Sequence, residues 1–311
     1  MQHFRDLLFG ILCFLGLTTQ SVWACEICGC GAGNLYFGIL PNSERHLLGL
    51  RFRNIQYKSH LYPNDPYARL FETKERFFIY EVLGRFKLNS RINLNVFLPY
   101  AEAIQERSDK TFYRQGLADA TLWAQYKFLD TERLHPDWDW KQQAQFGTGL
   151  KIPTGAWKFG DESSGAVENA NFQPGTGSWD FLITGQYLLR YKSIGFQTDI
   201  QWRYNTANPD QYRFGNRISG NANFLYYRVW KGPFSIMPFS GLYGEFGKKN
   251  TDRGYQIIKT GGKLVMLNSG VQLHWKRYSI LAQWQHPIFQ DLSGGQIKAL
   301  ARGLIQAALA F

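Results

Sequence analysis

The most regular pattern of apolar and polar positions runs from residue 194 to residue 205. One set of alternate positions is Ile194, Phe196, Thr198, Ile200, Trp202 and Tyr204, and the other includes Gln197, Asp199, Gln201, Arg203 and Asn205. Side chains alternate between two faces in a β-strand, whereas they recur about every 3.6 residues in a helix. The pattern therefore predicts a strand with one face toward lipid and one toward water.

Similar patterns predict twelve strands along the chain, most of them long enough to cross a membrane, which takes about 9–11 residues. They are 45–60, 74–88, 91–105, 116–129, 140–153, 179–191, 194–205, 212–230, 234–247, 262–275, 278–286 and 298–311.

The connections between these strands alternate in length. Short turns are predicted at 89–90, 192–193, 231–233 and 276–277, with 130–139 as a longer exception. Longer loops are predicted at 61–73, 106–115, 154–178, 206–211, 248–261 and 287–297. Short periplasmic turns and longer extracellular loops are typical of outer-membrane barrels. We therefore predict an all-β chain whose residues 45–311 form a transmembrane antiparallel up-and-down barrel, with both termini in the periplasm.

The last eight residues, from Leu304 to Phe311, alternate apolar side chains and finish on an aromatic ring. This ending is expected of the strand that closes an outer-membrane barrel. We expect it to be bound by the barrel-assembly machinery, and the apolar outer face to contact outer-membrane lipids. The predicted location is thus the outer membrane of a Gram-negative bacterium.

Composition supports a barrel more than a bundle of membrane helices. Aromatic residues make up 16% of the chain, yet no apolar run approaches the roughly 20 residues of a membrane helix. The net charge is +11, but the basic residues are spread along the strands and turns. We expect no nucleic-acid partner, and a basic lumen or loops facing anionic lipopolysaccharide instead. A soluble β-sandwich is the alternative, but it would give no reason for the sorted turns.

Residues 1–24 are predicted to be a signal peptide. Arg5 precedes an apolar stretch at 7–17, and Val22 and Ala24 occupy the small-residue positions of a cleavage site. The apolar stretch is short for a membrane anchor, which must cross roughly 30 Å. Cleavage after Ala24 would begin the mature chain at the following cysteine.

Segment 25–44 is predicted to be a periplasmic segment that carries the three mature cysteines, Cys25, Cys28 and Cys30. Thiolates favour copper(I) or zinc, and three of them suit trigonal copper(I), whereas zinc needs a fourth ligand. Lipidation of Cys25, a disulfide in the oxidising periplasm, or a plug segment without a role for its thiols are the alternatives.

The polar positions of the predicted strands identify candidate lumen-lining residues. They are Gln143, Gln145, Lys151, Gln186, Arg190, Gln197, Asp199, Gln201, Arg203, Gln283 and Gln285. Twelve strands lie between small, filled barrels and porins of about 16–18 strands with an open channel. We expect a narrow, partly obstructed lumen.

Four phrases at strand ends resemble a known family. They are Phe-Leu-Pro-Tyr at 97–100, Gly-Leu-Ala-Asp-Ala at 116–120, Gly-Leu-Lys-Ile-Pro-Thr-Gly at 149–155 and Pro-Gly-Thr-Gly-Ser-Trp-Asp at 174–180. Together they resemble the outer-membrane barrel transporters named for the meta-pathway of phenol degradation. The match covers the third to sixth strands best. The resemblance implies passage of small solutes, apolar or aromatic ones among them. Physically, the prolines end strands and the glycines permit turns.

An enzyme is not expected. Some barrels of this size hydrolyse lipids with a serine and a histidine, but Ser178, Ser219 and His286 show no nucleophile motif. The first hypothesis is therefore a channel or transporter for a small-molecule solute, with no cofactor required. The alternative is a metal-handling outer-membrane protein that binds copper or zinc through its cysteines.

Overall fold

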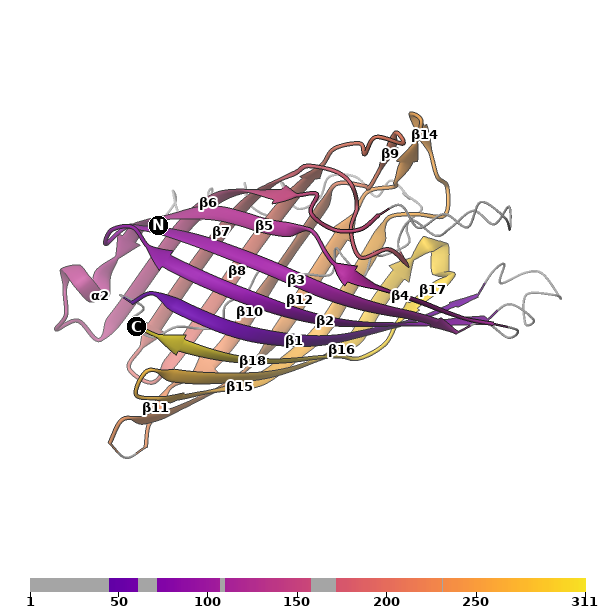
Figure 1. Ribbon diagram of the computed structural model, residues 1–311. Coiled ribbons are helices and arrows are strands. Elements are labelled where there is room, and N and C mark those ends of the chain that lie inside the picture. The colour runs from indigo at the N-terminus through magenta and orange to yellow at the C-terminus, as the bar shows by residue number, and fades with distance from the viewer. Residues whose placement is uncertain (1–44, 61–71, 107–109, 158–171, 231) are drawn as a thin grey trace, which may run out of the picture.

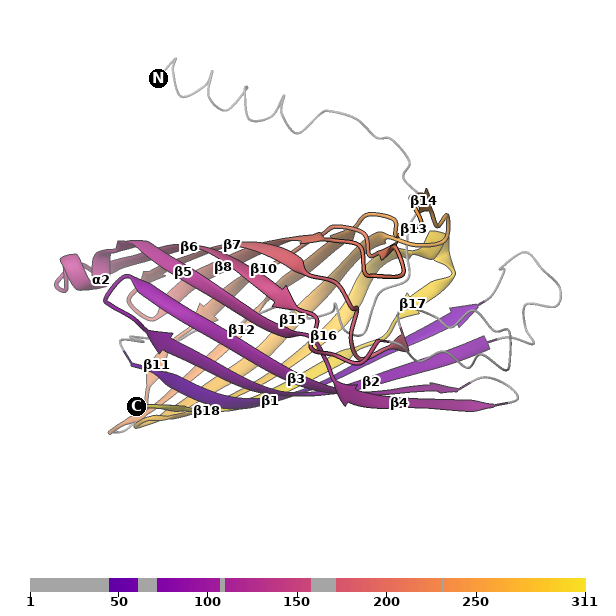
Figure 2. The same cartoon turned by 45° about the horizontal axis from the view of Figure 1, so that its top comes forward.

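The computed structural model describes residues 45–60, 72–106, 110–157, 172–230 and 232–311. Within these ranges the chain forms one closed antiparallel barrel (Figures 1 and 2). The sheet has fifteen segments, but β4 and β5, β10 and β11, and β17 and β18 are each two parts of one spanning strand, so twelve strands surround the interior. The predicted twelve-stranded barrel is confirmed. The predicted signal peptide and the cysteine segment lie outside the described residues.

The spanning strands follow one another around the barrel in chain order. They are β1 (Leu47–His60), β2 (Glu72–Lys87), β3 (Ile92–Glu106), β4 (Thr111–Leu117) with β5 (Ala120–Asp130), β6 (Trp140–Ile152), β7 (Asp180–Tyr191), β8 (Ile194–Asn205), β10 (Arg217–Tyr226) with β11 (Arg228–Val229), β12 (Phe234–Gly247), β15 (Gly262–Trp275), β16 (Tyr278–Leu292), and β17 (Ile297–Ala299) with β18 (Arg302–Ala310).

Pairing between the first and last strands closes the barrel. The register of β1 with β18 runs from Leu47 opposite Ala310 to Asn54 opposite Gly303, and β17 continues the same ladder. The amide of His46 donates to the carbonyl of Phe311 (3.1 Å), and the amide of Phe311 donates back (3.0 Å). Closure leaves no sheet edge at this seam, which a lipid environment requires because it cannot satisfy free backbone groups.

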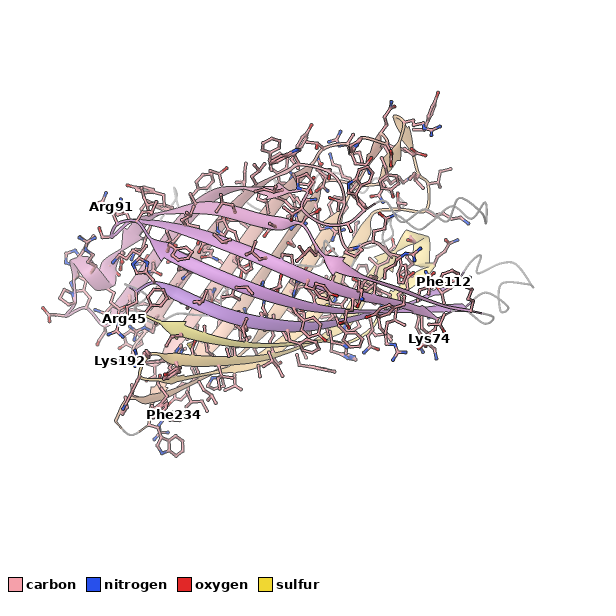
Figure 3. The ribbon with its side chains drawn as sticks, in the orientation of Figure 1. Arg45, Lys74, Arg91, Phe112, Lys192 and Phe234 are labelled. Carbon is pink, nitrogen blue, oxygen red and sulfur yellow. The ribbon has the colours of Figure 1, made fainter. Side chains whose placement is uncertain are left out.

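The two ends of the barrel differ. One end, here the short-turn end, carries Arg45, Arg91, Lys192 and Phe234, and the opposite, long-loop end carries Lys74 and Phe112 (Figure 3). The short-turn end also holds α2 (Thr131–Leu134), which occupies the one longer connection there. At the long-loop end, β9 (Tyr212–Arg213), β13 (Thr251–Asp252) and β14 (Tyr255–Gln256) form a separate small sheet.

Three predicted strands match the structure residue for residue, namely β8, β12 and β15. Four others were placed wrongly. Most of the predicted loop 106–115 belongs to the β3–β4 hairpin. The predicted strand 116–129 is interrupted at residues 118–119, between β4 and β5. The prediction also fused β9 with β10 and β11, ignored the break between β17 and β18, and ended the eleventh strand at His286.

Proline explains the last of these errors. The prediction ended the strand at His286, directly before Pro287, but β16 continues to Leu292. Pro287 pairs with Met266 and Phe289 pairs with Val265, so Ile288 is left over as a bulge. A bulge lets a strand accommodate a residue that cannot donate to the ladder.

A belt of exposed apolar side chains surrounds the barrel, with at least one on each spanning strand. Representative members are Leu50, Val82, Leu98, Leu122, Phe146, Ile183, Ile200, Phe224, Leu242, Leu267, Ile280 and Ile305. A contiguous apolar surface of this extent is unfavourable in water and favourable against lipid tails. Among the residues that the structure describes, no helix is long and apolar enough to span a membrane.

Candidate functional site inside the barrel

Polar and charged side chains fill much of the inner face. Along β8, residues 197, 199, 201, 203 and 205 are buried, whereas the intervening Ile200, Trp202 and Tyr204 are exposed on the outside. The alternation seen in the sequence is thus an alternation between the interior and the outer surface of the barrel.

The structure groups nine of the eleven predicted lumen residues on the wall formed by β6, β7 and β8. Gln145 lies opposite Gln186, which lies opposite Asp199. The other two, Gln283 and Gln285, lie on β16. Buried members are Lys151, Gln197, Asp199, Gln201 and Arg203; half-buried members are Gln143, Gln145, Gln186, Arg190, Gln283 and Gln285. Contact of these residues with a passing solute stays a prediction.

An apolar cluster, which the sequence did not predict, occupies the interior toward the long-loop end. Its members are Ile55, Tyr57, Phe77, Ile79, Ala101, Ala103, Ala118, Phe172, Tyr243, Leu264, Met266, Leu292 and Ala299. The Phe77 ring meets Tyr57 edge to face with centroids 6.1 Å apart, and Phe172 at 6.4 Å. On β2 the outward neighbours Phe78 and Tyr80 are also aromatic, so both faces of the strand are apolar and the inward set gives no separate signal.

Two arginines on β1 share a glutamate on β2 deeper in the barrel. Arg51 Nε lies 2.5 Å from Glu81 Oε2, and Arg53 Nη2 lies 2.9 Å from Glu81 Oε1. The guanidinium of Arg51 also lies over the ring of Phe97, 4.9 Å from its centroid. All three charged side chains are buried, where ion pairs are strong but desolvation is costly.

A second charged group, the arginine–tyrosine cluster, borders the apolar cluster. Arg302 Nη2 donates to the hydroxyl of Tyr57 (2.9 Å), and Arg302 Nη1 lies 3.9 Å from Glu245. Tyr243 donates to Glu245 (2.5 Å), and Arg217 pairs with the same carboxylate at 2.9 Å. The Arg302 guanidinium lies 5.7 Å from the Tyr57 ring centroid and 6.0 Å from that of Tyr243, within the range of cation–π attraction.

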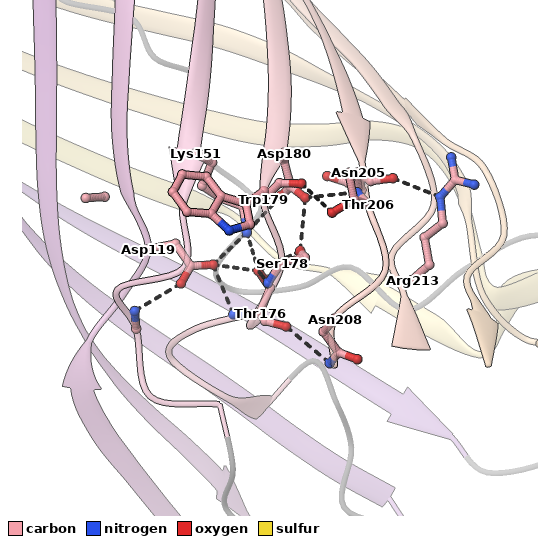
Figure 4. A network of polar contacts seen from close by, with 12 residues as sticks. Asp119, Lys151, Thr176, Ser178, Trp179, Asp180, Asn205, Thr206, Asn208 and Arg213 are labelled. Atoms are coloured by element: carbon pink, nitrogen blue, oxygen red, sulfur yellow. Dashed lines mark hydrogen bonds and ion pairs between the residues drawn. The ribbon is translucent and has the colours of Figure 1, made fainter. Parts of the chain in front are cut away.

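The third charged group joins three of the four family-like sequence motifs, 116–120, 149–155 and 174–180, at the long-loop end (Figure 4). Lys151 Nζ lies 2.6 Å from Asp119 Oδ2 and 2.8 Å from Asp180 Oδ2, and it also contacts the Thr176 hydroxyl. Thr176 donates to Asp119 through its hydroxyl (2.6 Å) and its amide (3.0 Å). Ser178 donates to Asp180 (3.0 Å). We call these five residues the rim network.

The rim network holds residues 172–179, which we call the strap, against the barrel. The amide of Gly155 donates to Asp119 (3.1 Å), and the amide of Gly175 donates to the carbonyl of Ala156 (2.9 Å). A Cβ at Gly175 would lie 2.5 Å from the carbonyl carbon of Gly155, so only glycine fits this crossing. Phe172 of the strap thereby joins the apolar cluster. These three motifs therefore build one architectural junction.

Metal and enzyme candidates find no support in the described part of the chain. Cys25, Cys28 and Cys30 lie outside the described residues, so copper or zinc binding there stays a prediction. Within the described residues, no group of three or more His, Cys, Asp or Glu side chains could hold a metal ion. Ser178 and Ser219 are buried while His286 is exposed, so a serine–histidine pair at the outer face does not involve them.

Comparison with known proteins places the fold. No protein-family model and no curated protein matches the sequence. An outer membrane channel from Pseudomonas putida F1 superposes with a TM-score of 0.63 at 13% identity, covering 88% of this chain and 100% of that chain. The β-domain of a Bordetella autotransporter reaches a TM-score of 0.48 at 10% identity, covering 86% and 100%. The similarity to the Pseudomonas putida protein shows a shared outer-membrane barrel fold.

Proposed function

We propose that this protein is an outer-membrane channel for small solutes with an apolar or aromatic body. The apolar cluster inside the closed barrel carries the proposal. Lipid contact explains apolar side chains on the outer face, but it does not require them inside. Apolar side chains inside the barrel favour a passing molecule that is itself apolar. The Pseudomonas putida protein with the same fold is described as a channel, which supports the proposal.

The proposal includes an orientation of the barrel in the outer membrane. The short-turn end, with both barrel termini, faces the periplasm, and the long-loop end faces the outside. The outer belt contacts outer-membrane lipids after the signal peptide has been removed. The closing strand β18, which Phe311 directly follows, is the segment that the barrel-assembly machinery binds.

Solute flux into liposomes tests the proposal. Stopped-flow light scattering compares benzamide, an aromatic solute, with erythritol, a polar one, and subtracts the flux of protein-free liposomes. We expect the protein to accelerate the entry of benzamide into the liposomes more than the entry of erythritol. Phe77→Ala, inside the barrel, should lower the benzamide preference because it removes a ring of the apolar cluster. Phe78→Ala, the next residue on the outer face, is the matched control and should not.

Two outcomes oppose the proposal. No flux above protein-free liposomes, in the wild type and in Phe77→Ala, would show that the interior is only packed. Equal effects of Phe77→Ala and Phe78→Ala would show that the inner ring does not contact the solute.

A further inference from the structure

We infer that the channel selects small aromatic or apolar carboxylates, and that Arg302 receives the carboxylate. The inference rests on the proposed function and adds a charge to the solute. Arg302 is 5% exposed, and its Nε has no hydrogen-bond partner among the described residues. An unsatisfied guanidinium N–H in the interior is costly, and a carboxylate is the group that it binds best.

Other guanidinium groups gather near Arg302. Arg217 shares the Glu245 carboxylate with Arg302. Arg203 is the register partner of Arg217 on the neighbouring strand. Arg53 lies on β1, the strand next to Arg302, where it pairs with Glu81. A cluster of guanidinium groups attracts an anion, so it favours a carboxylate at Arg302.

The neighbouring rings fit the rest of the solute. Phe172, Phe77 and Tyr57 follow one another from the strap inward, and Tyr57 then accepts the hydrogen bond of Arg302. A planar aromatic body can pack against these rings while its carboxylate meets the guanidinium. The site thus combines an apolar wall and a cation at its inner boundary, which is the complement of an aromatic acid.

Benzoate and benzamide distinguish charge from shape, because they differ only in the head group. Their binding to the folded full-length protein in detergent is measured by titration calorimetry at pH 8, where benzoate is ionised. We expect benzoate to bind at least about tenfold more tightly than benzamide, a difference of about 1.4 kcal/mol. Arg302→Gln should abolish this difference and leave benzamide binding unchanged. Arg302→Lys should keep part of this affinity difference, because lysine retains the positive charge but lacks the planar guanidinium group that can bind a carboxylate through two hydrogen bonds.

Arg228→Gln, at the exposed short-turn end, is the control and should change neither affinity. Heat-modifiable mobility on gels establishes that each variant is folded. Equal wild-type binding of the two solutes would overturn the inference, and this outcome does not depend on any variant folding. An unchanged benzoate preference in folded Arg302→Gln would also overturn it. If liposome flux of benzamide is observed in either case, the proposed channel stands while the carboxylate site fails.

Discussion

Lys151 is expected to hold the strap against the barrel, and its replacement by methionine tests this directly. The substitution keeps the length and apolar stem of the side chain but removes the ammonium group. Lys151 Nζ lies 2.6 Å from Asp119 and 2.8 Å from Asp180, and the three side chains are only 2–4% exposed. Without the lysine, two buried carboxylates face each other without their shared cation.

The expected loss of stability is large. Removing one partner of a buried ion pair costs about 3–5 kcal/mol, because the remaining charge stays desolvated. The lower end applies here, since Asp119 keeps hydrogen bonds from Thr176 and Gly155, and Asp180 keeps one from Ser178. We expect about 3 kcal/mol for Lys151→Met.

Denaturant unfolding in lipid vesicles measures this free energy, and limited proteolysis of residues 172–179 reports whether the strap is released. Lys192→Met is the control, because the pair of Lys192 with Asp139 spans 3.4 Å and both side chains are about 60% exposed. An exposed pair contributes little, so we expect no measurable change there. Adding Asp119→Asn and Asp180→Asn to Lys151→Met should recover stability by removing the uncompensated charges. A Lys151→Met effect no larger than the control, or no recovery in the triple variant, would refute the reasoning.

Two further substitutions test the interior in the same assays. Glu81→Gln removes the carboxylate that Arg51 and Arg53 share and should lower the free energy of unfolding by about 3–5 kcal/mol. Glu132→Gln, in a partly exposed pair with Arg190, is the control and should lower it by less than about 1 kcal/mol. Similar losses in both variants would contradict the argument that burial sets the cost. Gly175→Ala should cost about 1–3 kcal/mol and speed cleavage of the strap, because its Cβ meets backbone that cannot move aside. Gly244→Ala is the control, because nothing lies within 4 Å of its Cβ. If the clash with the backbone is the cause, this variant should leave the free energy of unfolding and the rate of cleavage unchanged.

The outer architecture could be predicted from the sequence because each spanning strand shows its lipid-facing side by its own alternation of apolar and polar residues. The bounds of β8, β12 and β15 follow from local alternation and from short turns that end it. The interruptions were not predictable in this way. The bulge at Ile288 depends on the strand opposite, and the pause at residues 118–119 depends on Lys151 and Thr176, which approach from other segments.

The interior contacts depend on closure of the barrel, so sequence patterns could not predict them. Arg302 and Tyr57 are 245 positions apart in the chain, yet they share a hydrogen bond. Neither residue has a distinctive local signal, since Tyr57 lies between Gln56 and Lys58, and Arg302 lies between Ala301 and Gly303. Likewise the phrases at 116–120, 149–155 and 174–180 mark strand ends one by one, and only the fold shows that their charged side chains meet.

Stability alone does not account for this interior. Well-packed apolar residues often stabilise a protein as much as a buried ion pair does, because the pair must first be desolvated. The barrel nevertheless buries Arg51, Arg53, Arg302 and their carboxylates beside an apolar cluster that could have extended further. Such charges cost stability wherever their compensation is incomplete, as it is at Arg302 Nε. A channel that must favour one head group over another needs this kind of site, because only an unsatisfied donor gains a partner when the solute arrives.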